Sequence, residues 1–214
     1  MSFYQTLITA TAPERQQLLQ LPVVTETMVG DVTLPRYLRF LSQAYHHVKH
    51  TVPLLMACGS RLAPQHLWLQ KAIAEYIEEE LGHEQWILND IKAAGGDAEA
   101  VAASSGDLTT EVMVAYAYDL ISRRNPLGFF GMVHVLEGTS IALATSAAAT
   151  IQQHLHLPNN AFSYLRSHGD LDIEHVQFFQ TLMDQIIDSD DQQVIINSAK
   201  HFYPLYGNVL SAAY

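Results

Sequence analysis

The eight residues from His168 to His175, HGDLDIEH, carry metal-binding side chains at helical spacing. Because a helix turns about 100° per residue, Asp172 and His175 lie side by side, and His168 lies two turns earlier on the same stripe. Two imidazoles and a carboxylate suit iron, manganese or zinc, and a carboxylate-rich set with open positions favours iron. A solvated polar helix face would show the same residues, so this octet alone leaves the metal site open.

A second cluster, EEELGHE over residues 78–84, places acids three and four residues before a histidine. Around a helix axis, Glu80 lies about 60° to one side of His83 and Glu79 lies about 40° to the other. Glu-x-x-His is the pair that helical bundles use for di-metal sites, which favours Glu80 over Glu79. A run of acids is also typical of a solvated face. Gly82 costs about 1 kcal/mol within a helix, which indicates that something packs close to the backbone there.

A third candidate, Glu137, stands among apolar neighbours in the sequence. A buried carboxylate is costly unless it is paired, protonated or bound to a cation. A partner such as Arg123 or a backbone hydrogen bond would satisfy it, but two other helices already offer metal ligands. The sequence therefore favours a set of three carboxylates and three imidazoles, enough for two metal ions: Glu80, His83, Glu137, His168, Asp172 and His175.

The elements that must position these residues all read as helices, and no strand pattern is convincing. Short helical pieces are expected in residues 1–33. Longer helices are expected over residues 34–57, 64–94, 109–124 and 126–154, from the octet to about 187, and over 191–211. We expect one all-α domain of about seven helices that spans residues 1–214.

Composition excludes several classes of function. The net charge of −11, from 22 acids against 11 bases, and the lack of a basic stripe disfavour nucleic acid as a partner. Cys58 is the only cysteine, which excludes an internal disulfide and fits a reducing compartment. No signal peptide is visible, and the apolar region near residues 141–151 looks too short and polar to span a bilayer. We expect a cytoplasmic protein without a membrane partner.

The chain resembles the haem-oxygenase-like diiron oxidases and oxygenases, relatives of the chlamydial protein associating with death domains (CADD). The same fold holds TenA-like thiaminase II and pyrroloquinoline-quinone synthase. The resemblance runs from YHHVKH at residues 45–50 to the octet, and its most specific parts are EELGHE, Glu137 and the octet. It implies that His83, Glu137 and the octet's His168, Asp172 and His175 bind metal. In some members of the family a glutamate lies seven residues before the histidine that corresponds to His83, and this chain has Tyr76 at that position. In other members the glutamate lies three residues before that histidine, and this chain has Glu80 there.

The resemblance implies a haem-oxygenase-like helical bundle that binds two iron ions, or iron with manganese. Such an enzyme would use dioxygen to oxidise a small organic substrate, and a homodimer is compatible with it. Residues expected to shape the substrate cavity are Tyr45, His46, His50, Tyr76, Phe129 and Phe130. The histidines among them, and Tyr76, could equally be hydrogen-bonded core residues.

Two alternatives remain open from the sequence. The first is a TenA-like or quinone-synthase-like enzyme without diiron chemistry. It is disfavoured because no cysteine nucleophile follows Cys58 and because the chain is acidic. The second is a non-catalytic module that binds metal or another protein.

Overall fold

The computed structural model describes residues 2–170 and 172–213, with the side chains of residues 168–175 left undescribed. Within the described residues every regular element is a helix, which confirms the all-α prediction. The α-helices are α1 (Phe3–Leu19), α2 (Pro22–Met28), α3 (Leu34–Val48), α4 (Thr51–Ser60), α5 (Leu69–Glu80), α6 (His83–Ala93), α7 (Ala98–Ala103), α8 (Leu108–Arg123), α9 (Phe129–Leu155), α10 (Ser163–Asp170), α11 (Asp172–Asp184) and α12 (Ser189–Ala212). Three short 3₁₀ turns join them: η1 (Pro64–His66), η2 (Pro126–Gly128) and η3 (Asn159–Ala161).

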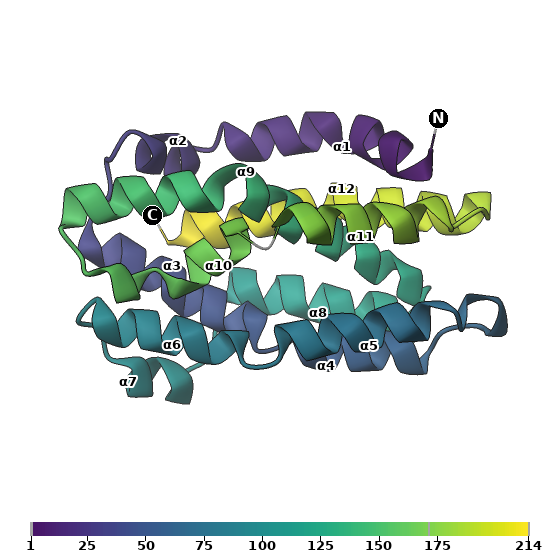
Figure 1. Ribbon diagram of the computed structural model, residues 1–214, viewed down its shortest axis with the longest axis horizontal. Helices are drawn as coiled ribbons and strands as arrows, with labels where there is room; N and C mark the ends of the chain where they lie inside the picture. The colour runs from purple at the N-terminus through teal and green to yellow at the C-terminus, as the bar shows by residue number, and fades with distance from the viewer. Residues whose placement is uncertain (1, 171, 214) are drawn as a thin grey trace.

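The helices form an elongated bundle whose long members run along its length (Figure 1). The long helices α9 and α12 pack against each other in the middle. On one side, α1 packs on α12, and on the other side α4, α5 and α6 form the opposite layer. Segments far apart in sequence thus meet along α9, which contacts α10, α11, α12 and α2.

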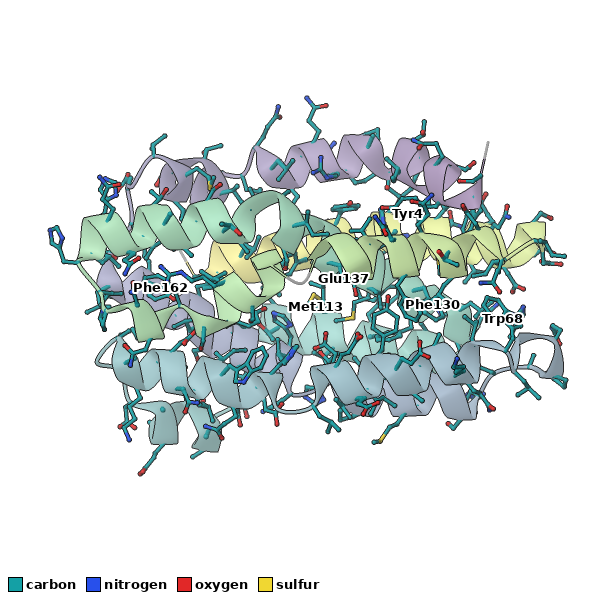
Figure 2. All side chains as sticks on the ribbon, in the orientation of Figure 1. Tyr4, Trp68, Met113, Phe130, Glu137 and Phe162 are labelled. Atoms are coloured by element: carbon teal, nitrogen blue, oxygen red, sulfur yellow. The ribbon has the colours of Figure 1, made fainter. Side chains whose placement is uncertain are left out.

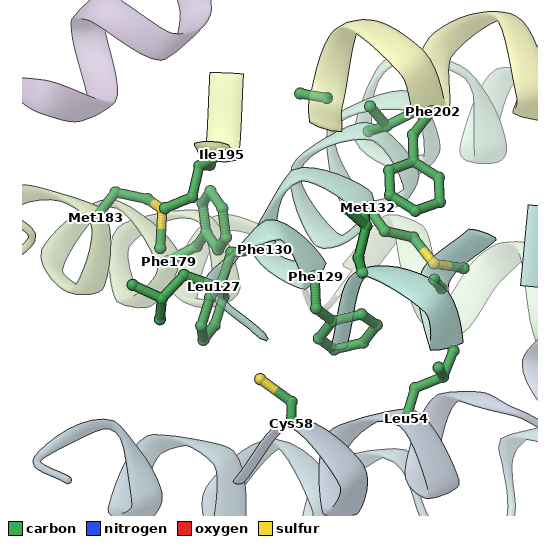
Figure 3. Packing of buried hydrophobic residues seen from close by; sticks show 14 of the residues in the cluster. Leu54, Cys58, Leu127, Phe129, Phe130, Met132, Phe179, Met183, Ile195 and Phe202 are labelled. Atoms are coloured by element: carbon green, nitrogen blue, oxygen red, sulfur yellow. The ribbon is translucent and has the colours of Figure 1, made fainter. Parts of the chain in front are cut away.

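Two hydrophobic clusters make up the core, one toward each end of the bundle. Figure 3 shows part of the larger one, where Phe130 of α9 lies beside Phe179 of α11, with Phe129 and Cys58 of α4 nearby. The smaller cluster contains Tyr37 of α3 and other buried residues of α3, α6, α9 and α10. Burial of this apolar surface supplies most of the stabilisation that holds the helices together.

Two of the long helices expected from the sequence are each divided in two. The helix expected over residues 34–57 ends at Val48, and α4 begins at Thr51, so that Pro53 falls in the first turn of α4. Proline fits there because the first turn leaves its N–H groups without intrahelical partners. The helix expected over residues 64–94 divides at Leu81 and Gly82, where the glycine has φ +92°.

This conformation corrects the interpretation of Gly82. A Cβ atom at this position would meet no described atom within 4 Å, so none of the described residues packs closely on its backbone. The glycine is instead suited to a left-handed turn that side chains with a Cβ atom rarely adopt.

The apolar stretch around α9 is longer than the sequence analysis expected. Within Pro126–Leu155 a window of 18 residues has a mean hydropathy of 1.4, so by length and composition the helix could cross a membrane. Of that window, 56% is buried inside the bundle, and a central core helix passes the same test.

Candidate metal centre

Glu80 and His83 meet at the junction of two helices. Glu80 ends α5 and His83 begins α6, and the left-handed turn at Gly82 brings the Glu80 Oε2 to 3.0 Å from the His83 Nδ1. The imidazole is almost wholly buried, and its ring lies against that of Trp86 with 4.1 Å between centroids. A carboxylate and an imidazole are therefore held together at one point.

Both side chains line a cavity of about 80 Å³ between α4, α5, α6, α9 and α12, which we call the central cavity. Glu137 lines the same cavity from the middle of α9, and Figure 2 labels it near the centre of the bundle. The remaining walls are mostly apolar and include Leu54, Leu55 and Met132. The structure thus places Glu80, His83 and Glu137, three of the predicted metal ligands, on the wall of one largely apolar cavity.

The other three predicted ligands, His168, Asp172 and His175, have side chains outside the described residues. Their backbone is described as α10 up to Asp170 and as α11 from Asp172, and residue 171 lies outside the described residues. The expected helical path through the octet therefore also falls partly outside the described residues. Both helices contact α9, and α10 also contacts α6, so the two helices that include the octet pack on the helices that carry Glu137 and His83.

A buried carboxylate that the sequence analysis missed fixes the start of α10. Asp90 of α6 is wholly buried and accepts hydrogen bonds from the backbone N–H of Ser163 (2.9 Å) and of Tyr164 (2.8 Å). It also accepts one from the Ser163 hydroxyl. The first turn of α10 leaves N–H groups that need acceptors, and Asp90 supplies them from the helix of His83.

Among the side chains that the structure describes, no three histidine, cysteine or acidic residues are close enough to hold a metal ion by themselves. The described part of the predicted ligand set is the Glu80–His83 pair together with Glu137.

Tyr76 also lines the central cavity. It is 3% exposed, and its hydroxyl has no hydrogen-bond partner among the described residues. Burial raises the pKa of this phenol, and the carboxylates of Glu137, Glu79 and Glu80 raise it further. A buried donor without an acceptor costs about 1–3 kcal/mol, so this hydroxyl marks a place where a bound group can be accommodated.

The structure places the predicted substrate-cavity residues in different surroundings. Phe129 lines the central cavity with Tyr76, whereas Phe130 is fully buried in the larger core cluster. Tyr45, His46 and His50 do not line the central cavity.

The two histidines have hydrogen-bond partners elsewhere. His46 Nε2 lies 3.0 Å from the Ser104 hydroxyl, and His50 Nδ1 lies 3.2 Å from the Tyr118 hydroxyl. The alternative that they are hydrogen-bonded wall or core histidines therefore describes them better than a place on this cavity.

The histidine of α3 that does line the central cavity is His47. The buried side of α3 includes Leu41, Ala44 and Val48. His47 follows Ala44 by three residues and lies about 60° from it around the helix, whereas His50 lies about 180° from Leu41. The position of the apolar stripe is the signal that identifies His47.

A comparison with models of protein families identifies one family. A family model described as iron-containing redox enzymes, of the haem-oxygenase type, matches residues 38–207. No curated protein sequence matches the chain.

Several solved structures share the fold at low sequence identity. A domain of unknown function with a haem-oxygenase-like fold from Shewanella denitrificans OS217 has a TM-score of 0.87 and 21% identity, covering 98% of this chain and 91% of its own. A TenA homologue from Pseudomonas syringae pv. tomato DC3000 has a TM-score of 0.81 and 12% identity, covering 99% of this chain and 92% of its own. A CADD-like protein of unknown function from Nostoc punctiforme PCC 73102 has a TM-score of 0.73 and 16% identity, covering 98% of this chain and 97% of its own.

These structures confirm the haem-oxygenase-like fold that the resemblance implied. The family match covers most of the chain, from within α3 to within α12, and includes the Glu80–His83 turn, Glu137 and the octet. The chain therefore belongs to the haem-oxygenase-like family of iron-containing redox enzymes.

Proposed function

We propose that this protein uses dioxygen to oxidise a small organic substrate at a centre of two iron ions, or of one iron and one manganese ion. The ligands in this proposal are Glu80, His83, Glu137, His168, Asp172 and His175. The observation that carries it is that Glu80, His83 and Glu137, from three different helices, line one central cavity in a chain of the iron-containing family.

The residues of the central cavity fit such a centre. Carboxylates and imidazoles together are the ligands that non-haem iron enzymes use, and the Tyr76 hydroxyl lacks a partner among the described residues. When bound, iron supplies the electrons and the binding position that dioxygen needs. The chain itself supplies the ligands, their placement and a dry cavity.

Each described side chain has a definite part in this proposal. The carboxylate of Glu80 lies against the imidazole of His83 and fixes the orientation of its ring. Tyr76 stays protonated at neutral pH because its pKa is raised, so it can donate a hydrogen bond into the central cavity. The apolar wall formed with Leu54 and Phe129 limits the entry of water.

The TenA-like alternative draws support from the shared fold, but the cysteine chemistry it would need is disfavoured. Cys58 is fully buried in the core, its thiol lies 3.4 Å from the carbonyl oxygen of Pro126, and burial raises its pKa to about 12. A thiol in this state is a poor nucleophile at neutral pH because the thiolate is the reactive form.

Oxygen uptake by the ferrous-loaded protein tests the proposal. The parent should consume dioxygen and develop new visible absorption, whereas His83→Ala and Glu137→Ala should do neither, because each loses a metal ligand. His46→Ala is the matched control, since His46 is as buried as His83 but does not line the central cavity. Equal oxygen uptake by the parent, His83→Ala and Glu137→Ala would show that the ligand assignment is wrong.

A further inference from the structure

A cavity of about 630 Å³ lies between α1, α9, α11 and α12, and we call it the α1–α9 cavity. Glu137 lines both this cavity and the central cavity, so the two adjoin at a proposed iron ligand. Tyr4 and Glu137, which both line it, are labelled in Figure 2. Its volume falls in the range of about 300–1,000 Å³ that is typical of small-molecule sites.

Buried aromatic rings form one wall of this cavity. His134 lies roughly parallel to Phe179, with 6.2 Å between ring centroids, and meets the ring of Tyr203 edge-on at the same separation. The Thr11 hydroxyl lies 3.2 Å from His134 Nε2 and helps to hold the imidazole in place. Burial, together with the positive charge of Arg15, lowers the pKa of His134 to about 4, so this ring is uncharged at neutral pH.

Among the described residues that line the α1–α9 cavity, the cationic one is Arg15, an exposed residue of α1. No hydrogen bond or ion pair joins its guanidinium to another described residue. A guanidinium presents a planar fork of N–H donors that matches a carboxylate. The negative charge of Glu137 disfavours an anionic group beside it, so an anionic ligand would place its charge at Arg15 and its uncharged part near Glu137.

Gly138 makes room in this cavity directly beside Glu137. It lies inside α9, where a glycine weakens the helix, and a Cβ atom there would meet no described atom within 4 Å. None of the described neighbours therefore requires a glycine at this position. Because Gly138 lines the α1–α9 cavity, a larger side chain would project into the space that a ligand would use.

We infer that the α1–α9 cavity binds the substrate as a small carboxylate with an apolar or aromatic skeleton. Arg15 holds the carboxylate, and the skeleton lies along the aromatic wall toward Gly138 and Glu137. This inference rests on the proposed function for the reaction, but the binding step needs only residues of α1, α9, α11 and α12.

The test measures binding of paired probes to the metal-free and the iron-loaded protein by calorimetry and thermal unfolding. The probes are butyrate, octanoate, benzoate and 4-phenylbutyrate, each beside the alcohol with the same carbon skeleton. At least one acid should bind the parent about tenfold or more tightly than its alcohol, because only the acid makes a charge-assisted pair with Arg15.

Three variants locate the site. Arg15→Gln should weaken binding of that acid about tenfold or more, to the level of its alcohol. Arg123→Gln changes net charge equally at an exposed position of α8 away from the cavity and should leave binding unchanged. Gly138→Leu should block acid and alcohol alike by filling the space, and its unfolding transition shows whether it folds.

The outcomes separate this inference from the proposed function. An acid preference that Arg15→Gln abolishes supports the binding site even if the parent holds no iron. No acid preference in the parent, or equal binding by Arg15→Gln and the parent, would overturn the inference even if two iron ions are bound.

Discussion

At the scale of single residues, the Glu80–His83 pair is the most sharply defined part of the candidate centre. The two side chains touch at 3.0 Å across a left-handed turn, and both line the central cavity. Glu79 is one residue away but is absent from the lining of that cavity. This difference supports Glu80, which the sequence favoured through its Glu-x-x-His spacing.

Glu80→Gln should lower the iron content toward one ion per chain, because an amide is a weaker ligand for iron than a carboxylate. Glu79→Gln is the matched control and should bind as much iron as the parent. Elemental analysis after anaerobic loading with ferrous iron measures both. Retention by Glu80→Gln with loss by Glu79→Gln would transfer the ligand role to Glu79.

The sequence indicated some residues of the central cavity correctly and missed others for a physical reason. Glu80, His83 and Glu137 have the chemistry and spacing that mark metal ligands, and the structure brings them to one cavity. His47 and Asp90 carry no such spacing signal. His47 is identified by the buried side of its helix, and Asp90 by its contact with Ser163 and Tyr164, more than seventy residues later in the chain.

At the scale of elements, the turn between α5 and α6 decides how Glu80 and His83 meet. The sequence analysis expected one continuous helix here because the acidic and apolar residues kept a helical period through the break. A single glycine with φ +92° ends α5 and starts α6 in a new direction. Hydrophobic periodicity predicts the existence of helices more reliably than the positions of the breaks between them. One residue with positive φ is enough to make such a break.

Gly82→Ala should lower the free energy of unfolding by about 1–2 kcal/mol, because alanine is strained at this φ. It should also weaken iron binding, because the turn sets the distance between Glu80 and His83. Gly95→Ala is the matched control: Gly95 has φ +87° and the same open surroundings, but lies outside the site.

Chemical denaturation and iron titration separate the two effects. Both alanine variants should lose similar stability, whereas only Gly82→Ala should lose affinity for iron. Equal iron affinity in the two variants would mean that the turn does not position the Glu80–His83 pair.

At the scale of the whole molecule, α9 joins the two sides of the bundle. It carries Glu137, which lines the central cavity with residues of α5 and α6 and lines the α1–α9 cavity with residues of α1 and α11. The all-α class followed from the helical periodicity and the lack of strand patterns. The arrangement of the helices did not follow from local patterns, because it depends on contacts between distant segments such as α6 with α10 and α1 with α12.

The central claim is that ligands from the α5–α6 turn, α9 and the octet together bind two iron ions. Anaerobic equilibrium dialysis of ferrous iron against the parent and Glu137→Ala tests it most directly, with the exposed Glu111→Ala as control. The parent and Glu111→Ala should each bind two iron ions per chain, and Glu137→Ala should bind fewer. Two bound ions in Glu137→Ala, or fewer than two in the parent, would contradict the claim.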